Sequence, residues 1–236
     1  MKNPLVSVII TTREEEKYLT RTLQAVRNQT YRPIEIVVSD AESRDKTVQI
    51  ARKHGAKVFV KKTNIPQGRN YGAEKSRGKI LVFLDADTIL EKNWIKKVVE
   101  DLQTKKMDMI VGVFRPVEKS FSAKITCWIW SDFLPYILKI FGKEMHGGGS
   151  TFVIKRNIFM LSGGFKEDQA MLEDAEFVNR ISRKRKVLWD RQLVSRTSMR
   201  RFRKGGYWKW CFYWFINGIN FLIFNKPLGK HYKVIR

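Results

Sequence analysis

Two aspartates separated by a single residue follow a strongly apolar segment, the run Lys-Ile-Leu-Val-Phe-Leu over residues 79–84. Asp85 and Asp87 would lie in a turn directly after a buried strand, where both carboxylates can face one hard cation such as Mn²⁺ or Mg²⁺. A cation held there would neutralise the charge of a bound diphosphate. Asp-x-Asp turns also occur by chance on protein surfaces, but the unbroken apolar strand before this one favours a metal site.

A second pair of acids, Glu173 and Asp174, begins nine residues after Gly164 in the turn Gly163-Gly164-Phe165. A carboxylate in such a place can act as a general base that removes the proton from an attacking hydroxyl group. The competing interpretation is a charge pair at a helix N-terminus, which the helix dipole stabilises. The two acids alone favour the charge pair, and the glycine turn before them favours the base.

Alternating apolar strands and amphipathic helices are expected to position these acids. Strands are expected over residues 5–12, 34–38, 56–60 and 79–84, and helices over 14–28, 47–54, 68–77 and 91–104. This alternation with short connections predicts an α/β fold whose parallel sheet is covered by helices on both faces. Ligands bind beyond the carboxyl ends of the strands in such sheets. Asp40 and Asp85, which follow the second and fourth strands, should therefore lie at one edge of the sheet.

Beyond residue 109 the pattern becomes mixed. Strands are expected over 109–114, 152–154 and 187–189, an apolar, aromatic helix or pair of helices over 121–141, and a helix over 173–184. The run His146-Gly147-Gly148-Gly149-Ser150 is interpreted as a loop whose backbone approaches a ligand.

A series of short motifs, in this order and spacing, resembles the family 2 glycosyltransferases. The motifs are Ser7-Val-Ile-Ile-Thr-Thr, Leu23 to Gln29, Glu35-Ile-Val-Val-Ser-Asp40 with Ser43, Asp45 and Thr47, Gly68-Arg69-Asn70-x-Gly72, Asp85-Ala86-Asp87, Gly163-Gly164-Phe165 and Glu173-Asp174. The resemblance implies the GT-A fold, with a Rossmann-like, mainly parallel sheet flanked by helices. It also implies a nucleotide-diphosphate sugar as donor, a divalent cation (Mn²⁺ or Mg²⁺) as cofactor, and inversion at the anomeric carbon. We expect a GT-A domain over residues 1–200 and a basic, aromatic, membrane-associating tail over 201–236.

The resemblance assigns roles to individual residues of this chain. The residues expected at the donor are Thr11, Arg13, Glu15, Asp40, Arg69, Asp85 and Ala86. Among them, Asp40 matches the acid that holds the nucleoside base or ribose. Asp87 and Asp85 match the metal ligands, with Asp87 the more direct one, and Asp174 matches the general base. If the acceptor is already a phosphate, a base is hardly needed.

The sequence departs from the family pattern in three places. The first loop reads Thr11-Thr12-Arg13-Glu14-Glu15 where the family usually has Pro-Thr-Tyr-Asn-Glu, and Ala41 replaces the usual second aspartate. The Gln-x-x-Arg-Trp motif of processive synthases is missing from the sequence, which argues against a long-chain polymerase. The basic run from Arg200 to Lys204 is a further candidate for contact with the diphosphate; a solvated basic surface or a lipid-headgroup patch is the alternative.

Positive charge is concentrated at the C-terminal end. The 236 residues include 46 Lys or Arg and 23 Asp or Glu, a formal charge of +23, and residues 177–236 hold 16 of the basic residues and one acid, Asp190. A hydrophobic fraction of 43% excludes a disordered polyelectrolyte. The same quarter of the chain contains the aromatic run over 207–215. Basic residues beside a Trp- and Tyr-rich run are typical of a bilayer interface, so no nucleic acid is expected as a partner.

The apolar run over 208–224 is short for a spanning helix, which needs about 20 apolar residues, and Lys209, Asn217 and Asn220 interrupt it. An interfacial helix on an anionic membrane surface is therefore favoured. The aromatic segment over 125–141 would make a second contact. This arrangement would suit a lipid-linked acceptor such as a polyprenyl phosphate, at the cytoplasmic face of the cell membrane. The alternative is that the two aromatic segments pack on each other as core.

Two other classes of protein remain as alternatives. Phe83-Leu84-Asp85-Ala86-Asp87-Thr88 fits the nucleophile motif of a haloacid-dehalogenase-like phosphatase with Asp85 as nucleophile, but the later Gly-Asp-x-x-x-Asp motif is missing from the sequence. A basic nucleic-acid-binding protein is the other alternative. It is supported by the charge of +23 alone, without a nucleic-acid-binding motif.

Overall fold

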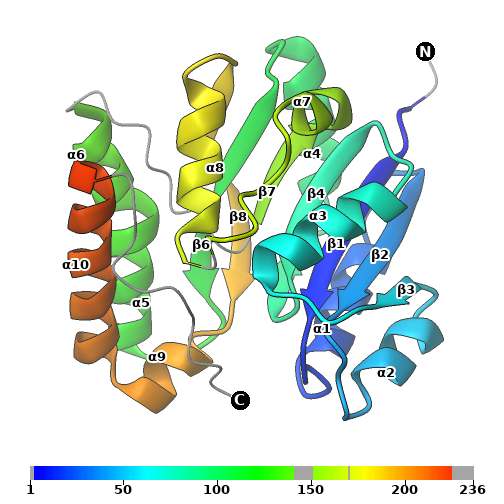
Figure 1. Cartoon of the computed structure of the whole chain (residues 1–236), viewed down its shortest axis with the longest axis horizontal. Coiled ribbons are helices and arrows are strands. Elements are labelled where there is room, and N and C mark those ends of the chain that lie inside the picture. The colour runs from blue at the N-terminus through cyan, green and yellow to red at the C-terminus, as the bar shows by residue number, and fades with distance from the viewer. Residues whose placement is uncertain (1–2, 141–150, 170, 225–236) are drawn as a thin grey trace.

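The computed structural model describes residues 3–140, 151–169 and 171–224. The predicted loop over 146–150 and the basic residues after 225 lie outside the described residues. Within the described part of the chain, eight strands form one sheet with helices on both faces (Figure 1). The strands are β1 (Val6–Thr12), β2 (Ile34–Asp40), β3 (Lys57–Val60), β4 (Ile80–Asp85), β5 (Thr88–Leu90), β6 (Met109–Pro116), β7 (Thr151–Lys155) and β8 (Val187–Thr197).

The helices connect and cover these strands. They are α1 (Leu19–Arg27), α2 (Thr47–Lys53), α3 (Ile65–Lys75), α4 (Trp94–Thr104), α5 (Phe121–Trp128), the π-helical turn η1 (Ile129–Phe133), α6 (Leu134–Ile140), α7 (Arg156–Leu161), α8 (Glu173–Ser182), α9 (Arg200–Gly205) and α10 (Tyr207–Phe224).

The first half of the sheet is parallel, as predicted, in the order β3-β2-β1-β4. Register pairs Thr12 with Asp40 on one side of β1, and Thr11 with Asp85 on the other. The carboxyl ends of the three strands therefore meet at one edge, which brings together acids that are far apart in the sequence.

The second half of the sheet is mixed. Strand β7 runs antiparallel between β4 and β6, β8 is parallel to β6, and the short strand β5, which was not predicted, pairs antiparallel with β8. Strand β8 is also much longer than the predicted 187–189 and continues to Thr197. This extension carries the chain back to the edge where Asp85 and Asp87 lie, because Thr88 of β5 pairs with Thr197.

Alternate residues of the strands point to opposite faces, and each face has its own apolar core. Val8 and Ile10 of β1 pack toward α1, α2 and α4, whereas Ile9 packs toward α3, α7 and α8. The second core is aromatic. Phe83 stacks on Phe152 with ring centroids 4.9 Å apart. Side chains fully buried on both faces explain the nearly continuous apolar strands of the sequence.

Residues 14–16 were expected in the first helix, but α1 begins at Leu19. The backbone N–H groups of Glu14 and Glu15 donate to the side-chain hydroxyls of Ser43 and Thr47, at 2.8 and 2.7 Å. The N–H of Glu16 donates to the carboxylate of Asp45 at 3.1 Å. Side chains of the loop after β2 thus satisfy donors that a helix would leave unpaired in its first turn. The two loops are fixed to each other beside the sheet edge.

The segments predicted as membrane-contacting helices lie side by side at one end of the molecule (Figure 1). Trp130 of η1 and Trp214 of α10 approach with ring centroids 6.2 Å apart, and Phe221 is buried against Leu172 and Ala175 at the start of α8. Residues 201–224 are therefore packed against the rest of the fold through their inner faces. Of the helices within 3–140, 151–169 and 171–224, none has both the length and the apolarity to cross a bilayer.

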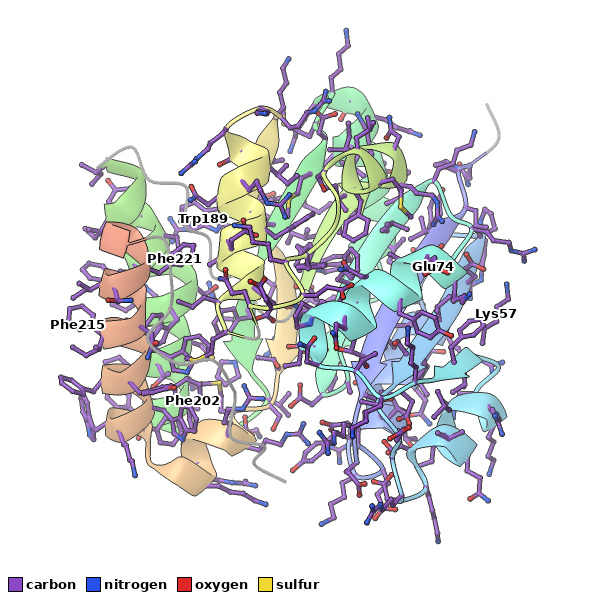
Figure 2. The ribbon with its side chains drawn as sticks, in the orientation of Figure 1. Lys57, Glu74, Trp189, Phe202, Phe215 and Phe221 are labelled. Carbon is purple, nitrogen blue, oxygen red and sulfur yellow. The ribbon has the colours of Figure 1, made fainter. Side chains whose placement is uncertain are left out.

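The outer faces of the same helices expose large apolar side chains. Trp208 is 85% exposed and Phe121 is 78% exposed, and Figure 2 shows Phe215 on the outer side of α10. The other apolar residues exposed on this aromatic face are Ile125, Trp128, Phe133, Tyr136, Ile140, Phe212, Tyr213, Ile216 and Ile219. The alternative that the two aromatic segments pack on each other as core thus applies to their inner sides. Their outer sides, which form the aromatic face, remain uncovered.

Candidate active site

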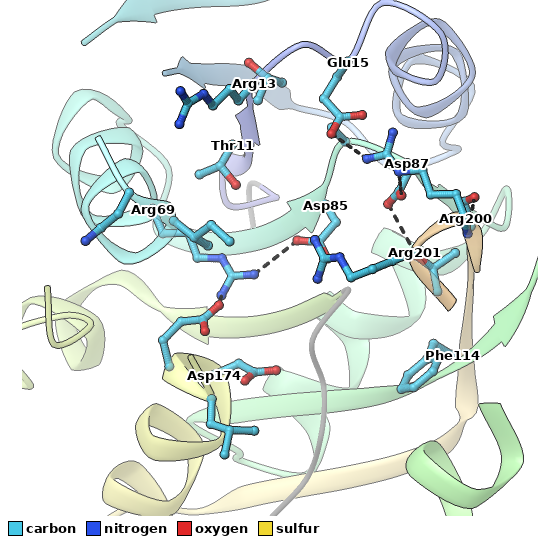
Figure 3. A pocket seen from close by; sticks show the side chains of 18 of the residues that line it. Thr11, Arg13, Glu15, Arg69, Asp85, Asp87, Phe114, Asp174, Arg200 and Arg201 are labelled. Carbon is cyan, nitrogen blue, oxygen red and sulfur yellow. Dashed lines mark hydrogen bonds and ion pairs between the residues drawn. The ribbon is translucent and has the colours of Figure 1, made fainter. Parts of the chain in front are cut away.

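A cavity of about 360 Å³ lies beyond the carboxyl ends of β1, β2 and β4. The residues predicted from the sequence that line it are Thr11, Arg13, Glu15, Arg69, Asp85, Ala86, Asp87 and Asp174. Figure 3 shows Asp85 and Asp174 facing the cavity from opposite sides. The fold therefore brings eight of the nine predicted site residues into one place.

Asp40, the ninth, is fully buried below the cavity. Its carboxylate accepts hydrogen bonds from the Thr12 hydroxyl at 2.7 Å and from the Ser43 hydroxyl at 2.6 Å. The neighbours Ser39 and Ala41 line the cavity instead. In this structure Asp40 ties together the loops after β1 and β2, and its contact with a nucleoside stays a prediction.

Arg69 connects the two acidic motifs. Its guanidinium donates to Asp85 Oδ1 at 3.1 Å and to Glu173 Oε1 at 2.9 Å. The side chains of Arg69 and Glu173 are 6% and 7% exposed, so this pair is shielded from water and holds its geometry more firmly than a surface ion pair. The rings of Phe152 and Phe165 lie 5.7 and 5.4 Å from the guanidinium carbon and fix its plane.

The motif Gly68-Arg69-Asn70-x-Gly72 packs closely against neighbouring elements and thereby positions Arg69. A side chain at Gly72 would meet Ile9, with a Cβ only 2.5 Å from its Cγ2, so the glycine lets α3 lie close against β1. Asn70 exchanges two hydrogen bonds of 2.9 Å with the backbone of Phe165. The φ angles of Gly163 and Gly164 are +77° and +69°, and Gly164 lies next to the side-chain amide of Asn70. Motifs separated by about a hundred residues thus form one structural unit that positions Arg69.

Asp87 lies against Arg200, the first residue of the basic run that the sequence offered as a candidate for contact with the diphosphate. Its Oδ2 is 3.1 Å from Nε of Arg200, whose Nη2 is 2.5 Å from Glu15 Oε1. Burial raises the pKa of Asp87 to about 7, against the opposing attraction of Arg200. Burial also raises the pKa of Glu15, which Arg200 again opposes. The sequence predicts a diphosphate contact for the run from Arg200 to Lys204, but it does not connect Arg200 to Asp87.

The donor groups at this end of the cavity fit a hard divalent cation. Asp85 and Asp87 offer carboxylate oxygens, and Oε2 of Glu15 is buried without a hydrogen-bond partner in the described part of the chain. In residues 3–140, 151–169 and 171–224, no three His, Cys, Asp or Glu side chains are placed to hold a metal ion among themselves.

Glu173 and Asp174 begin α8, where the preceding Leu172 has a left-handed backbone with φ of 53°. Asp174 is 9% exposed, and its Oδ1 accepts a hydrogen bond from the N–H of Ala175 at 2.8 Å. Burial raises the pKa of Asp174, and it raises the pKa of Glu173 to about 7, with Arg69 opposing both shifts. A carboxylate whose pKa is raised toward neutrality holds a proton more readily, as a general base requires.

The opposite half of the cavity is apolar. Its lining includes Phe114, Leu172 and Met199, together with Trp130 and Leu134 of η1 and α6 and with Phe202 and Trp214 of α9 and α10. The sequence predicted a bilayer contact for residues 125–141 and 208–224 but not a part in the cavity. The site thus combines charged groups at the sheet edge with an apolar wall.

An α/β sheet that brings a carboxylate pair and a buried candidate base to one edge has the arrangement expected of an enzyme that acts on phosphorylated substrates. The chain belongs to glycosyl transferase family 2, whose sequence model matches residues 7–161. This finding confirms the predicted family and does not favour the phosphatase alternative for Asp85.

Solved structures support the fold. The chain resembles S. aureus TarS 1-349 in complex with UDP-GlcNAc, with a TM-score of 0.66 and 19% identity over 83% of this chain and 58% of that one. It equally resembles the mannosyltransferase PcManGT from Pyrobaculum calidifontis in complex with GDP-Man and Mn²⁺, with a TM-score of 0.66 and 19% identity over 89% of this chain and 60% of that one. At this identity the likeness establishes the shared α/β fold.

Among curated proteins, one relative is a dolichyl N-acetyl-alpha-D-glucosaminyl phosphate 3-beta-D-2,3-diacetamido-2,3-dideoxy-beta-D-glucuronosyltransferase from Methanococcus voltae. It is 26% identical over 169 residues, which are 65% of this chain and 49% of that protein. The chain spans less than two thirds of the length of each of eight curated relatives that it matches.

Proposed function

We propose that the protein transfers a sugar from a nucleotide-diphosphate sugar to an acceptor, with inversion at the anomeric carbon. The observation that carries this proposal is the convergence of Asp85, Asp87 and Asp174 on one cavity at the sheet edge. The complexes named for TarS and PcManGT contain UDP-GlcNAc and GDP-Man, and the second also contains Mn²⁺. These relatives support the donor class and the divalent cation.

Asp174 accepts the proton of the acceptor hydroxyl as its oxygen attacks the anomeric carbon from the face opposite the diphosphate. The bond from that carbon to the diphosphate oxygen breaks, and its electron pair leaves with the nucleotide. A divalent cation bound at Asp85 and Asp87 would neutralise the charge that develops on the diphosphate. Arg69 holds Asp85 and Glu173 in place on either side of this reaction.

The acceptor that we propose is lipid-linked, such as a polyprenyl phosphate or a sugar carried by one. The apolar half of the cavity offers a surface for a hydrocarbon chain next to the charged half. The Methanococcus voltae relative, whose name contains a dolichyl-linked sugar phosphate, supports the same class. If the oxygen that attacks belongs to a phosphate rather than a hydroxyl, the role of Asp174 shrinks, because the nucleophile is already ionised.

A thermal-shift screen tests the donor class. We expect one of UDP-, GDP- or TDP-linked sugars to raise the melting temperature in the presence of Mn²⁺ or Mg²⁺ and not with EDTA, because a ligand stabilises the folded state that binds it. Transfer of labelled sugar from that donor to polyprenyl phosphate then tests the reaction. Release of inorganic phosphate without sugar transfer would contradict the proposal.

We further propose that the aromatic face rests on the anionic surface at the cytoplasmic side of a membrane. Trp208 and Phe212 expose apolar surface, and the exposed residues Arg203, Lys204 and Lys209 lie in the same helices, α9 and α10. Aromatic side chains beside basic ones suit the headgroup region, where each Lys or Arg adds about 1 kcal/mol of attraction near the surface. Phe202 of α9 and Trp214 of α10 also line the cavity, so a lipid acceptor would enter beside the membrane.

Flotation with anionic liposomes tests this orientation. The full chain should float at low salt, and the double variant Trp208→Ser, Phe212→Ser should lose most of that binding, because both side chains are exposed and their loss leaves the core intact. Leu161→Ser, at a residue 75% exposed on α7, is the matched control and should bind as the wild type does. A wild-type chain that stays with the soluble fraction, or a double variant that still floats, would refute the membrane surface.

A further inference from the structure

Arg200 lies between acids from two different loops. Its Nη2 is 2.5 Å from Glu15 Oε1 and its Nε is 3.1 Å from Asp87 Oδ2, as the dashed lines in Figure 3 show. The ring of Tyr18 lies 4.2 Å from the guanidinium carbon on a third side. The exposed fractions of the three charged side chains are between 13% and 15%, so water screens these contacts poorly.

The guanidinium of Arg200 pairs with the carboxylates of Glu15 and Asp87, which a divalent cation at this site would need. Asp87 is the more direct metal ligand in the proposed function, and its Oδ2 already faces Arg200. Glu15 has one oxygen on Arg200 and its other oxygen buried without a hydrogen-bond partner among the described residues. A doubly charged ion next to an arginine in such a poorly screened place would be strongly repelled. Arg200 and the cation therefore exclude each other at Asp87.

We propose that Arg200 is an internal counter-ion, which neutralises Asp87 in place of the divalent cation until a nucleotide-sugar donor binds. Arg200 then leaves Asp87 and pairs with the diphosphate, whose anionic oxygens match the fork of a guanidinium. The inference rests on the cation site of the proposed function. In this role Arg200 keeps Glu15 and Asp87 together before the cation binds, so that the cation binds only together with the donor.

The location of Arg200 permits this exchange. It is the first residue of α9, it lines the cavity, and its long side chain reaches Asp87 from a backbone that β8 brings to the sheet edge. In the proposed exchange the long side chain of Arg200 rotates away from Asp87 toward the diphosphate. Because binding free energies are reciprocal, cation and diphosphate should each strengthen the binding of the other, and typical couplings amount to about 5–150-fold.

Binding of Mn²⁺ alone to the full-length protein tests the proposal, with free Mn²⁺ followed by electron paramagnetic resonance and no nucleotide present. The variant Arg200→Gln should bind Mn²⁺ at least about tenfold more tightly than the wild type, within the range of such couplings. Arg200→Lys, which keeps the charge but not the two-pronged contact, should lie between them. It serves as the second variant if Arg200→Gln does not fold, which circular dichroism would reveal.

Two controls separate competition at Asp87 from a general effect of charge. Arg201→Gln removes the same charge from the lining of the same cavity and should change Mn²⁺ affinity much less. Adding Asp87→Ala to Arg200→Gln should abolish the gain. Equal binding by wild type and Arg200→Gln, including no measurable binding by either, or an equal gain in Arg201→Gln, would overturn the role of Arg200. A failure of sugar transfer in the wild type would instead overturn the proposed function, and it is read in a separate assay.

Discussion

Replacement of Asp174 by asparagine should lower the rate of sugar transfer to a hydroxyl acceptor by about 10²–10⁴-fold, which is the usual contribution of a general base. Binding of the nucleotide-sugar donor should remain within a factor of about two, because the change leaves Asp85, Asp87 and Arg69 intact. The measurements are initial rates of transfer and donor affinity by calorimetry. Loss of rate with retained affinity separates a group that acts in the reaction from one that holds the substrate.

The Asp174→Asn variant should fold, as the direction of the pKa shift of Asp174 indicates. Burial raises the pKa of Asp174 in the folded protein, so its charged form costs free energy of folding that a neutral amide does not. This cost is absent below the pKa that Asp174 has in the unfolded chain. It grows as the pH rises above that value and is complete above the pKa in the folded protein. Asparagine keeps an oxygen for the N–H of Ala175. The melting temperature of Asp174→Asn at neutral pH should therefore equal or exceed that of the wild type.

Two further variants identify which acid acts. Asp168→Asn makes the same change at an exposed acid and should leave the rate unchanged. Glu173→Gln weakens the pair with Arg69 and should lower donor binding as well as rate, whereas the base itself should affect rate alone. Near-normal transfer by Asp174→Asn together with a lost rate in Glu173→Gln would assign the base to Glu173.

The parallel half of the sheet could be predicted because its signals are local. Strands such as β1 and β4 are short apolar runs, and the rule that connections between parallel strands are short and right-handed places their carboxyl ends together. That is why Thr11, Asp85 and Asp87 could be expected at one edge. The length of helix α1 could not be predicted in the same way. Its expected first turn, which includes Glu15, is held outside the helix by the side chain of Thr47, the first residue of α2.

Long-range pairing decided the rest of the site. Nothing near Asp87 in the sequence indicates Arg200, since the long strand β8 and its pairing with β5 bring the two together. Likewise, the aromatic content of α10 favoured a membrane contact, with burial in the core as the alternative. Only the packing of Trp214 and Phe221 shows that one side of the helix belongs to the cavity wall and core, while Trp208 stays exposed. The motifs Gly68-Arg69-Asn70 and Gly163-Gly164-Phe165 were both recognised, but the hydrogen bonds between Asn70 and Phe165 were not predicted.

Replacement of Asp87 by alanine should abolish sugar transfer, a loss of at least about 10²–10³-fold, as expected when a group that stabilises the charge of the leaving diphosphate is removed. It should also remove the dependence of nucleotide binding on Mn²⁺, because Asp85 alone is left to hold the cation. The measurements are transfer rates and the affinity for nucleoside diphosphate with Mn²⁺ and with EDTA. Glu91→Ala, at an exposed acid in the following loop, is the control and should behave as the wild type.

The same variant should remain folded, which makes its loss of activity interpretable. Asp87 is a buried carboxylate whose desolvation offsets much of what its pair with Arg200 contributes, and Arg200 keeps Glu15 as a partner after the change. A shift of the melting temperature by only a few degrees is therefore expected. Activity and Mn²⁺ dependence that both survive in Asp87→Ala would show that the cation binds elsewhere. Loss of activity with Mn²⁺ dependence intact would mean that Asp87 acts on the substrate rather than on the metal.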